Sequence, residues 1–550
     1  MNLGRGNSLE KADTGAENAT DPIVDPSDWP ELVFGLVGPI GVNMAIVEQK
    51  LKEALVAVGY NPQSIRLTSL MSQIAVEGVE SAEPRDPAER YENRIAYANA
   101  VRRKCADDAA LTALAVAEIR AIRVRHWERV EGTQPKLVAN TPNSEESAGE
   151  TGKYENRPIA KTAYILRQLK REEEIVFLRK IYGRKFVQIS IHASEAQRIK
   201  NLERNFGTLN AELTPESCRK AAEQLVQKDM NERSDVHGQR IDEVFHLGDA
   251  FINGRNEDSI ADTIDRFINA FFGKNSISPN RDEYGAYMAA SASLRSIDLS
   301  RQVGAAIFSK AGEVIALGCN EVPKYGGGTY WGEDGEPHRD YDDGFDANRT
   351  EKNRIIYDFL KTLEDGGHLK DGYSAGALHS DSNFRKLIKK ASVSDLTEFG
   401  RMTHAEMTAL CDAARLGRRT KGATIFVTTF PCHNCAKHLI ASGIERVVFV
   451  EPYPKSKALS LHEDSAILDE RRDGRVSFEH FVGISPRRYR DIFEKGPRRN
   501  DDGTVAEWYE KQPKPRLEDK GPSYIWNEQS GVYYCLQKVA EELGIELEDD

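Results

Sequence analysis

The sequence contains no apolar run that approaches the roughly 20 residues of a membrane-spanning helix, so we expect no membrane span. The first 20 residues, MNLGRGNSLEKADTGAENAT, have no apolar core of a signal peptide, which predicts that the protein is not exported. Cysteine is scarce, with seven scattered over 550 residues, and this excludes a disulfide framework. Together these absences predict a reduced, cytoplasmic protein.

A surplus of positive charge is also missing. The chain has 75 Lys and Arg against 87 Asp and Glu, a formal net charge of −12 at pH 7. This balance repels long polyanions, and we find no tract that combines basic and aromatic residues. Composition therefore argues against a polynucleotide substrate and says little about small charged ligands.

Alternating strand and helix patterns predict a mixed α/β fold with two domains, as the length suggests. Residues 31–254 open with ELVFGLVGPIGVNMAIVEQKLKEALVAVGY, a buried strand, a glycine turn and an amphipathic helix typical of nucleotide-binding units. Residues 276–485 contain a hairpin, VGAAIFS and EVIALGCNE, followed by alternating helices and strands. The other expected segments are a disordered tail, a linking helix, an insertion that acts as a lid or oligomer contact, and a C-terminal extension: residues 1–30, 255–275, 325–400 and 486–550.

Two short motifs predict a metal site. THAEM supplies His404 and Glu406 at the start of a helix, and PCHNC supplies Cys432 and Cys435 after one intervening strand. We expect Pro431 to begin the second helix, because its missing N–H has no partner there. The two cysteines then share one helix face near the positive end of the helix dipole, which favours the thiolate form that binds zinc.

These ligands indicate a catalytic rather than a structural Zn²⁺ site. His404, Cys432 and Cys435 leave the fourth tetrahedral position for water. Glu406 is placed to take a proton from that water and to pass it to a ring nitrogen and a leaving amine. The order His-x-Glu then Pro-Cys-x-x-Cys is the signature of zinc deaminases, which attack C4 of cytosine or C6 of adenine.

Two other interpretations of the cysteine pair are possible, a redox dithiol and half of a zinc knuckle. A dithiol does not need the His-x-Glu motif, and a knuckle needs a second cysteine pair. The remaining cysteines are isolated in the sequence: Cys105, Cys218, Cys319, Cys411 and Cys535. We therefore favour the deaminase site, with His433 and His438 as surface or packing residues.

The sequence resembles the bacterial anti-phage dCTP deaminases, a branch of the cytidine and deoxycytidylate deaminases. The resemblance runs from about Glu31 to Glu494 and rests on GLVGPIG, YILRQLKREEE, ASLRSIDLSRQVGAAIF, GCNEVPK, HAEM, PCHNCA, EPYPKSKALSLHEDSA and FVGISPRRYRDIF. It implies an N-terminal P-loop-kinase-like parallel sheet domain followed by a three-layer α/β/α deaminase domain, assembled as a homo-oligomer. It also implies hydrolysis of dCTP to dUTP and ammonia, which depletes the cytosine deoxynucleotide pool and starves phage replication.

The resemblance also implies residues that bind the nucleotide. Asn320 matches the asparagine that contacts the sugar, although an asparagine here would also suit a turn. Arg301 and Lys324, with Arg295, are candidates for phosphate contacts or for ordinary salt bridges, and Tyr453 is a candidate for the base. A dCMP deaminase, a polynucleotide deaminase and a catalytically dead nucleotide sensor remain as alternatives.

The N-terminal glycine motif is a degenerate P-loop. A working loop reads G-x-x-x-x-G-K-[ST], whereas this chain has GPIGVNMA from Gly38, with Met44 for lysine and Ala45 for the hydroxyl. Gly35, Gly38 and Gly41 would keep a backbone cradle for anions. We expect nucleotide binding or a regulatory role, or a purely structural one, rather than phosphoryl transfer.

A second basic feature follows in this region. Arg167 and the helix RIKNLERN are expected to line a phosphate pocket, to bind a regulatory RNA or to form a solvated face. The predicted partners of this half of the chain are therefore a nucleotide effector or a regulatory RNA.

Overall fold

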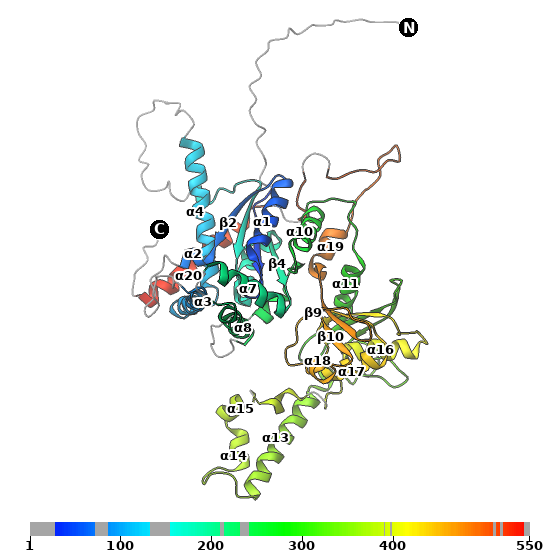
Figure 1. The fold of residues 1–550 in the computed structure, drawn as a ribbon. Coiled ribbons are helices and arrows are strands. Elements are labelled where there is room, and N and C mark those ends of the chain that lie inside the picture. Colours follow the sequence, from blue (N-terminus) through cyan, green and yellow to red (C-terminus); the bar gives the residue numbers. More distant parts are fainter. Residues whose placement is uncertain are drawn as a thin grey trace, which may run out of the picture.

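The computed structural model describes residues 28–71, 86–132, 154–209, 214–231, 241–389, 391–396, 399–509, 513–517 and 521–543. These residues form two six-stranded sheets with helices on their faces (Figure 1). The mixed α/β fold predicted from the sequence is confirmed, and both sheets consist mainly of parallel strands. Nearly all of the predicted disordered tail, residues 1–27, lies outside the described part of the chain. None of the described helices combines the length and the apolarity needed to cross a bilayer.

The first sheet has the strand order β12-β5-β4-β1-β3-β2. Its strands are β1 (Leu32–Val37), β2 (Asn61–Arg66), β3 (Thr162–Arg167), β4 (Phe186–His192), β5 (Ala250–Asn253) and β12 (Gly483–Ile484). Strands β1 to β5 are parallel, and all six residues of β1 are buried, as expected for the central strand of a sheet covered on both faces.

Helices cover both faces of this sheet and its carboxyl edge. One face carries α1 (Met44–Ala57) and α10 (Glu257–Phe271). The other carries α4 (Ala110–Gly132), α6 (Glu172–Tyr182) and the C-terminal α20 (Tyr524–Leu543). Three further helices pack beside the loop that follows β1: α3 (Pro87–Lys104), α7 (Glu195–Leu209) and α8 (Pro215–Asn231).

The second sheet has the order β10-β11-β9-β8-β6-β7. The predicted hairpin is confirmed as the antiparallel pair β6 (Gly304–Phe308) and β7 (Val314–Cys319). The parallel strands are β8 (Thr424–Thr429), β9 (Arg446–Glu451), β10 (Ala466–Leu468) and β11 (Val476–His480). Helix α11 (Arg281–Ser293) packs on one face, and the other face carries α16 (Ala405–Arg415), α17 (His433–Ala441) and α18 (Ala458–Leu461).

The insertion forms a small helical arm. It contains α12 (Asp340–Asp343), α13 (Ala347–Asp365), α14 (Ala375–Ser380) and α15 (Ser382–Ile388). Ile356, Leu360 and Ala375 form the buried centre of this arm. In Figure 1, α13, α14 and α15 stand apart from both sheets. The arm therefore has a core of its own, separate from that of the second sheet.

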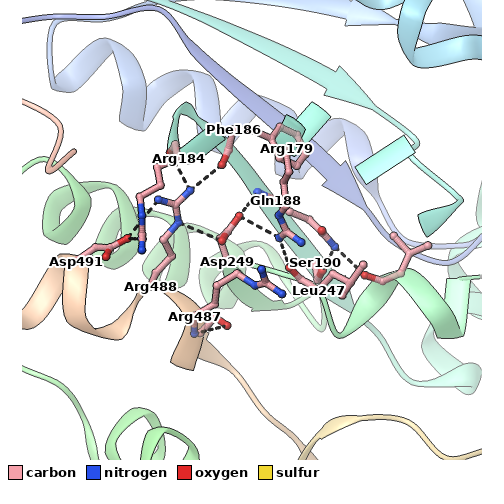
Figure 2. A network of polar contacts seen from close by, with 12 residues as sticks. Arg179, Arg184, Phe186, Gln188, Ser190, Leu247, Asp249, Arg487, Arg488 and Asp491 are labelled. Carbon is pink, nitrogen blue, oxygen red and sulfur yellow. Dashed lines mark hydrogen bonds and ion pairs between the residues drawn. The ribbon is translucent and has the colours of Figure 1, made fainter. Parts of the chain in front are cut away.

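The chain returns to the first sheet after β11. Strand β12 pairs antiparallel with β5, and the buried Arg488 follows, just before α19 (Tyr489–Phe493). Arg488 donates to the Asp249 carboxylate at 3.1 Å and to the carbonyl of Phe186 at 2.7 Å (Figure 2). Asp249 also accepts from the backbone N–H of Gln188 at 2.7 Å. The C-terminal segment thus completes the first sheet and is fixed to it by Arg488.

Candidate metal centre

The predicted zinc ligands occupy the starts of two neighbouring helices. His404 is the N-cap residue of α16, and Cys432 is the N-cap residue of α17. The helix therefore begins after Cys432 and not at Pro431, so the prediction for Pro431 is wrong by two residues. The physical reason is that the Cys432 sulfur accepts from the backbone N–H of Cys435 and so takes the capping role.

Small residues bring α16 close to the sheet and so fix His404. A Cβ atom on Gly318 of β7 would lie 2.2 Å from the carbonyl oxygen of Ala405 and 2.6 Å from the nitrogen of Ala409. Both alanines are fully buried. The first turn of α16, with His404 before it, therefore lies directly on β7 because residue 318 has no side chain.

The ligand atoms converge as a tetrahedral zinc site requires. Nδ1 of His404 lies 3.4 Å from Sγ of Cys432 and 3.3 Å from Sγ of Cys435. With Zn–S near 2.3 Å and Zn–N near 2.1 Å, adjacent ligand atoms of a tetrahedron are about 3.5 Å apart. The three residues fit Zn²⁺ by both donor chemistry and spacing.

Protons are shared among these groups. A hydrogen bond from Cys435 lowers the pKa of Cys432 to about 4, and the hydrogen bond with Cys432 raises the pKa of His404 to about 9. The same Cys432 contact raises the pKa of Cys435. The lowered pKa of Cys432 favours its thiolate form, the form that binds zinc, and zinc binding must displace any proton left on the three ligands.

Glu406 lies beside the ligands and is buried, with 4% of its surface exposed. Burial raises its pKa, against the opposing charge of His404. A carboxyl group next to the metal position, shielded from water and biased toward its protonated form, suits a group that receives and returns a proton.

The residues predicted to contact the nucleotide already have polar partners within the chain for most of their side-chain groups. Asn320 accepts from the backbone N–H of Val303 at 2.7 Å and donates to the carbonyl of Arg301 at 2.8 Å. Arg301 forms an ion pair with Glu451 at 3.2 Å, and Lys324 forms one with Asp334. Asn320 therefore shapes its turn and keeps one N–H and one lone pair for a ligand.

The remaining candidates are Arg295 and Tyr453. The Arg295 guanidinium stacks 3.7 Å over the ring of Trp331 and donates to the Thr329 hydroxyl at 2.6 Å, so it anchors the start of the insertion. Tyr453 is partly buried against the core of the second sheet.

Two positioning contacts near the site were not predicted. Ser456 donates to the carbonyl of Pro431 at 2.8 Å and so ties the loop after β9 to the start of α17. Glu451 accepts from the Thr429 hydroxyl at 3.0 Å as well as from Arg301. The only sequence signal for these contacts was their place within the EPYPKSK segment, which does not reveal what each residue touches.

The three predicted P-loop glycines have different surroundings. Gly35 lies inside β1, where a Cβ would meet Leu169 at 2.6 Å, so it is a packing residue. Gly38 follows β1, and a Cβ there would lie 2.4 Å from the end of the Met44 side chain. Gly41 has φ +93°, a conformation that favours glycine, and it approaches the backbone of Arg198.

The metal centre lies within a part of the chain that matches a known protein family. Residues 279–451 match the cytidine and deoxycytidylate deaminase zinc-binding region. This part of the chain is thus a zinc-binding domain of deaminase type, with the His404, Cys432 and Cys435 cluster as its metal site.

Individual relatives match over short stretches. The chain is 48% identical to the deoxycytidylate deaminase of Enterobacteria phage T2 over 54 residues, 10% of this chain and 29% of the phage protein. It is 43% identical to ComE operon protein 2 of Bacillus subtilis over 53 residues, 10% of this chain and 28% of that protein. The chain therefore spans less than a third of the length of these relatives.

A solved structure was also matched. It is a dCMP deaminase from the cyanophage S-TIM5 in complex with dCMP and dUMP, 17% identical, with a TM-score of 0.21. The match covers 37% of this chain and 98% of the phage chain.

Proposed function

We propose that this protein is a zinc-dependent deaminase that hydrolyses dCTP to dUTP and ammonia. The observation that carries the proposal is the convergence of His404 Nδ1 with the Cys432 and Cys435 sulfurs, beside the buried Glu406. The match of residues 279–451 to a deaminase zinc-binding region supports it. The anti-phage role, depletion of the cytosine deoxynucleotide pool, follows from the family resemblance.

The chain's own residues supply the proton transfers. When bound, zinc supplies a Lewis acid that activates water for attack on C4 of cytosine. Glu406 would take one proton from the attacking water and pass it to the ring nitrogen, and would then take the remaining proton from the new C4 hydroxyl and pass it to the leaving amine. One water is consumed, the bond from C4 to the exocyclic amine breaks, and dUTP and ammonia form.

We propose that Asn320 and its neighbours recognise the substrate. The remaining N–H and lone pair of Asn320 suit a sugar hydroxyl. Arg301 and Lys324 would exchange Glu451 and Asp334 for phosphate oxygens, and Tyr453 would face the base. These roles are proposed because all four residues come from segments that also frame the zinc ligands.

The test is ammonia release from dCTP, dCDP, dCMP, CTP and cytidine, with chromatography of the products. We expect dCTP to be deaminated fastest and a zinc chelator to abolish the reaction. Retention of ammonia release by Glu406→Ala, or no release from any cytosine nucleotide, would exclude the proposal.

A second candidate is deamination of dCMP to dUMP. The names of the phage relatives, which are deoxycytidylate deaminases, favour it. The same assay separates the two, because dUMP and dUTP elute apart and each substrate is supplied alone.

For the N-terminal half we propose a P-loop-kinase-like domain over residues 31–254, completed by the segment from β12 onward. The central β1, with β3 and β4 at its sides and a glycine loop before α1, supports this fold. We propose residues 255–275, whose helix α10 packs on the first sheet, as the link to the deaminase domain. The sequence predicts that domain over 276–485, and because β12 at 483–484 pairs with β5 we propose that it ends at about 480. A homo-oligomer and a regulatory RNA or nucleotide remain proposals from the resemblance.

A further inference from the structure

A cavity of about 400 Å³ opens at the carboxyl edge of the first sheet. The loop after β1, the loop after β3 and helices α3 and α7 surround it. Five cationic side chains line it, and no carboxylate does so within the described part of the chain: Arg94, Arg102, Arg167, Lys170 and Arg204. In a chain with a net charge of −12, the lining of this cavity is locally basic.

The rest of the lining is suited to a nucleoside. Apolar and aromatic groups come from Leu67, Tyr91, Ile95 and Leu111, and amide side chains come from Gln168, Asn201 and Asn205. Small-molecule sites have this combination of apolar walls with a few polar groups, and their volumes begin near 300 Å³. The carboxyl ends of parallel strands are also where open α/β sheets bind ligands.

We propose that this cavity binds a nucleoside phosphate as an effector, at a site separate from the zinc centre. The phosphates contact the arginines, and the apolar wall with its amides receives the nucleoside. This inference does not depend on the proposed deaminase activity, because none of the lining residues belongs to the zinc-binding region.

The glycine loop itself already holds an anion from the same chain. The Asp229 carboxylate accepts from the backbone N–H of Ile40 at 2.6 Å and from Arg198 at 3.0 Å. Its other oxygen lies 3.4 Å from Nζ of Lys170. A phosphate group in a working P-loop takes such contacts from backbone N–H groups and a lysine. The bound phosphates therefore lie toward the arginines, and the site binds without transferring a phosphoryl group.

Acidic groups outside the lining fix two of the arginines. Glu48 binds Arg167 at 2.7 Å, and Glu174 binds Arg102 at 2.9 Å. Arg204 on α7 is exposed, and no acidic group of the described residues pairs with it. Arg204 is thus the cation whose charge is most available to a ligand, and its exposure makes it a safe position for substitution.

The experiment is isothermal titration of the full chain with ATP, GTP, dATP, dGTP and dTTP, and with inorganic tripolyphosphate. None of these is a cytosine substrate. Arg204→Glu is compared with Lys200→Glu, the same charge change on an exposed residue of the same helix that does not line the cavity. Circular dichroism and thermal unfolding verify that both variants fold.

We expect at least one of these nucleotides to bind with one site per chain and more tightly than tripolyphosphate. Arg204→Glu should weaken that binding about tenfold or more, because a charge-assisted contact is replaced by repulsion. Lys200→Glu should leave it within about twofold. No saturable binding, equal binding of tripolyphosphate, or binding that Arg204→Glu leaves unchanged would overturn the proposal.

Discussion

Nε2 of His192 lies 2.9 Å from Oδ2 of Asp469, and this contact joins the end of β4 in the first sheet to the turn after β10 in the second. His480, at the end of β11, binds the same carboxylate through Nδ1 at 3.0 Å. The two imidazole rings stack with their centroids 3.6 Å apart. His480 also packs on Phe449, which contacts Phe430 just before the zinc-binding helix. This junction therefore lies on a continuous path of ring contacts between the two sheets.

The junction predicts that stability falls in mild acid. Burial, and then the charge of His192, lowers the pKa of His480 to about 4, against the opposing hydrogen bond with Asp469. Because the folded pKa is below the usual 6.5, the unfolded chain takes up the proton first as the pH falls. Stability should drop between about pH 6.5 and pH 4, by at most about 3 kcal/mol from this group.

Urea unfolding at pH 7.5, 5.5 and 4.5 measures this effect. His480→Gln should flatten the pH dependence in that window, whereas His368→Gln, at an exposed position of the insertion, should not. If the unfolding free energy of His480→Gln fell with pH as steeply as that of the unmodified protein, His480 would not be the cause of the acid destabilisation.

Removing the proton-transfer group should lower activity strongly while leaving the metal in place. We expect Glu406→Gln to lower kcat by about 10²- to 10⁴-fold, the usual contribution of general acid–base catalysis, with zinc content unchanged. Steady-state ammonia release with zinc analysis of the same sample measures both. A kcat near that of the unmodified protein would assign the proton transfers elsewhere.

Loss of one ligand should remove the metal. His404→Ala leaves two sulfurs, so zinc content should fall well below one ion per chain and the thermal midpoint should drop. Cys411→Ser is the matched control, because Cys411 is an exposed free cysteine on α16 outside the cluster. Full zinc occupancy in His404→Ala would contradict the ligand assignment.

The close packing of α16 on β7 leads to a prediction about a residue that does not contact the metal. Gly318→Ala should push α16 away from β7, since the new methyl group would lie 2.2 Å from the Ala405 carbonyl oxygen. We expect a loss of about 1 to 3 kcal/mol in unfolding free energy, typical of overpacking, together with weaker zinc retention against a chelator. Gly376→Ala, where no atom lies within 4 Å, should be close to neutral. Equal effects of the two substitutions would refute the packing argument.

Local patterns predicted the metal site well. His404 and the two cysteines are brought together by helix starts that follow neighbouring strands, and the spacing of short motifs encodes such positions. The start of α17 was predicted at Pro431 because proline favours the first turn, but the Cys432 sulfur was the stronger cap.

Long-range contacts were beyond sequence reasoning. Strand β12 has only two residues, which is too short for a hydrophobic pattern to predict its pairing with β5, more than 200 positions earlier. Asp229 contacts Ile40 across 189 positions of sequence. The sequence therefore contains no sign that a carboxylate of the same chain occupies the glycine loop. Asn320 has a turn-forming role that its motif did not distinguish from sugar binding.

The most direct measurement is ammonia release from dCTP by purified protein whose zinc content is titrated from zero to one ion per chain. We expect dUTP and ammonia to form in equal amounts and the rate to rise in proportion to bound zinc. Full activity at zero zinc, or no ammonia from any cytosine nucleotide at one zinc per chain, would contradict the proposed function.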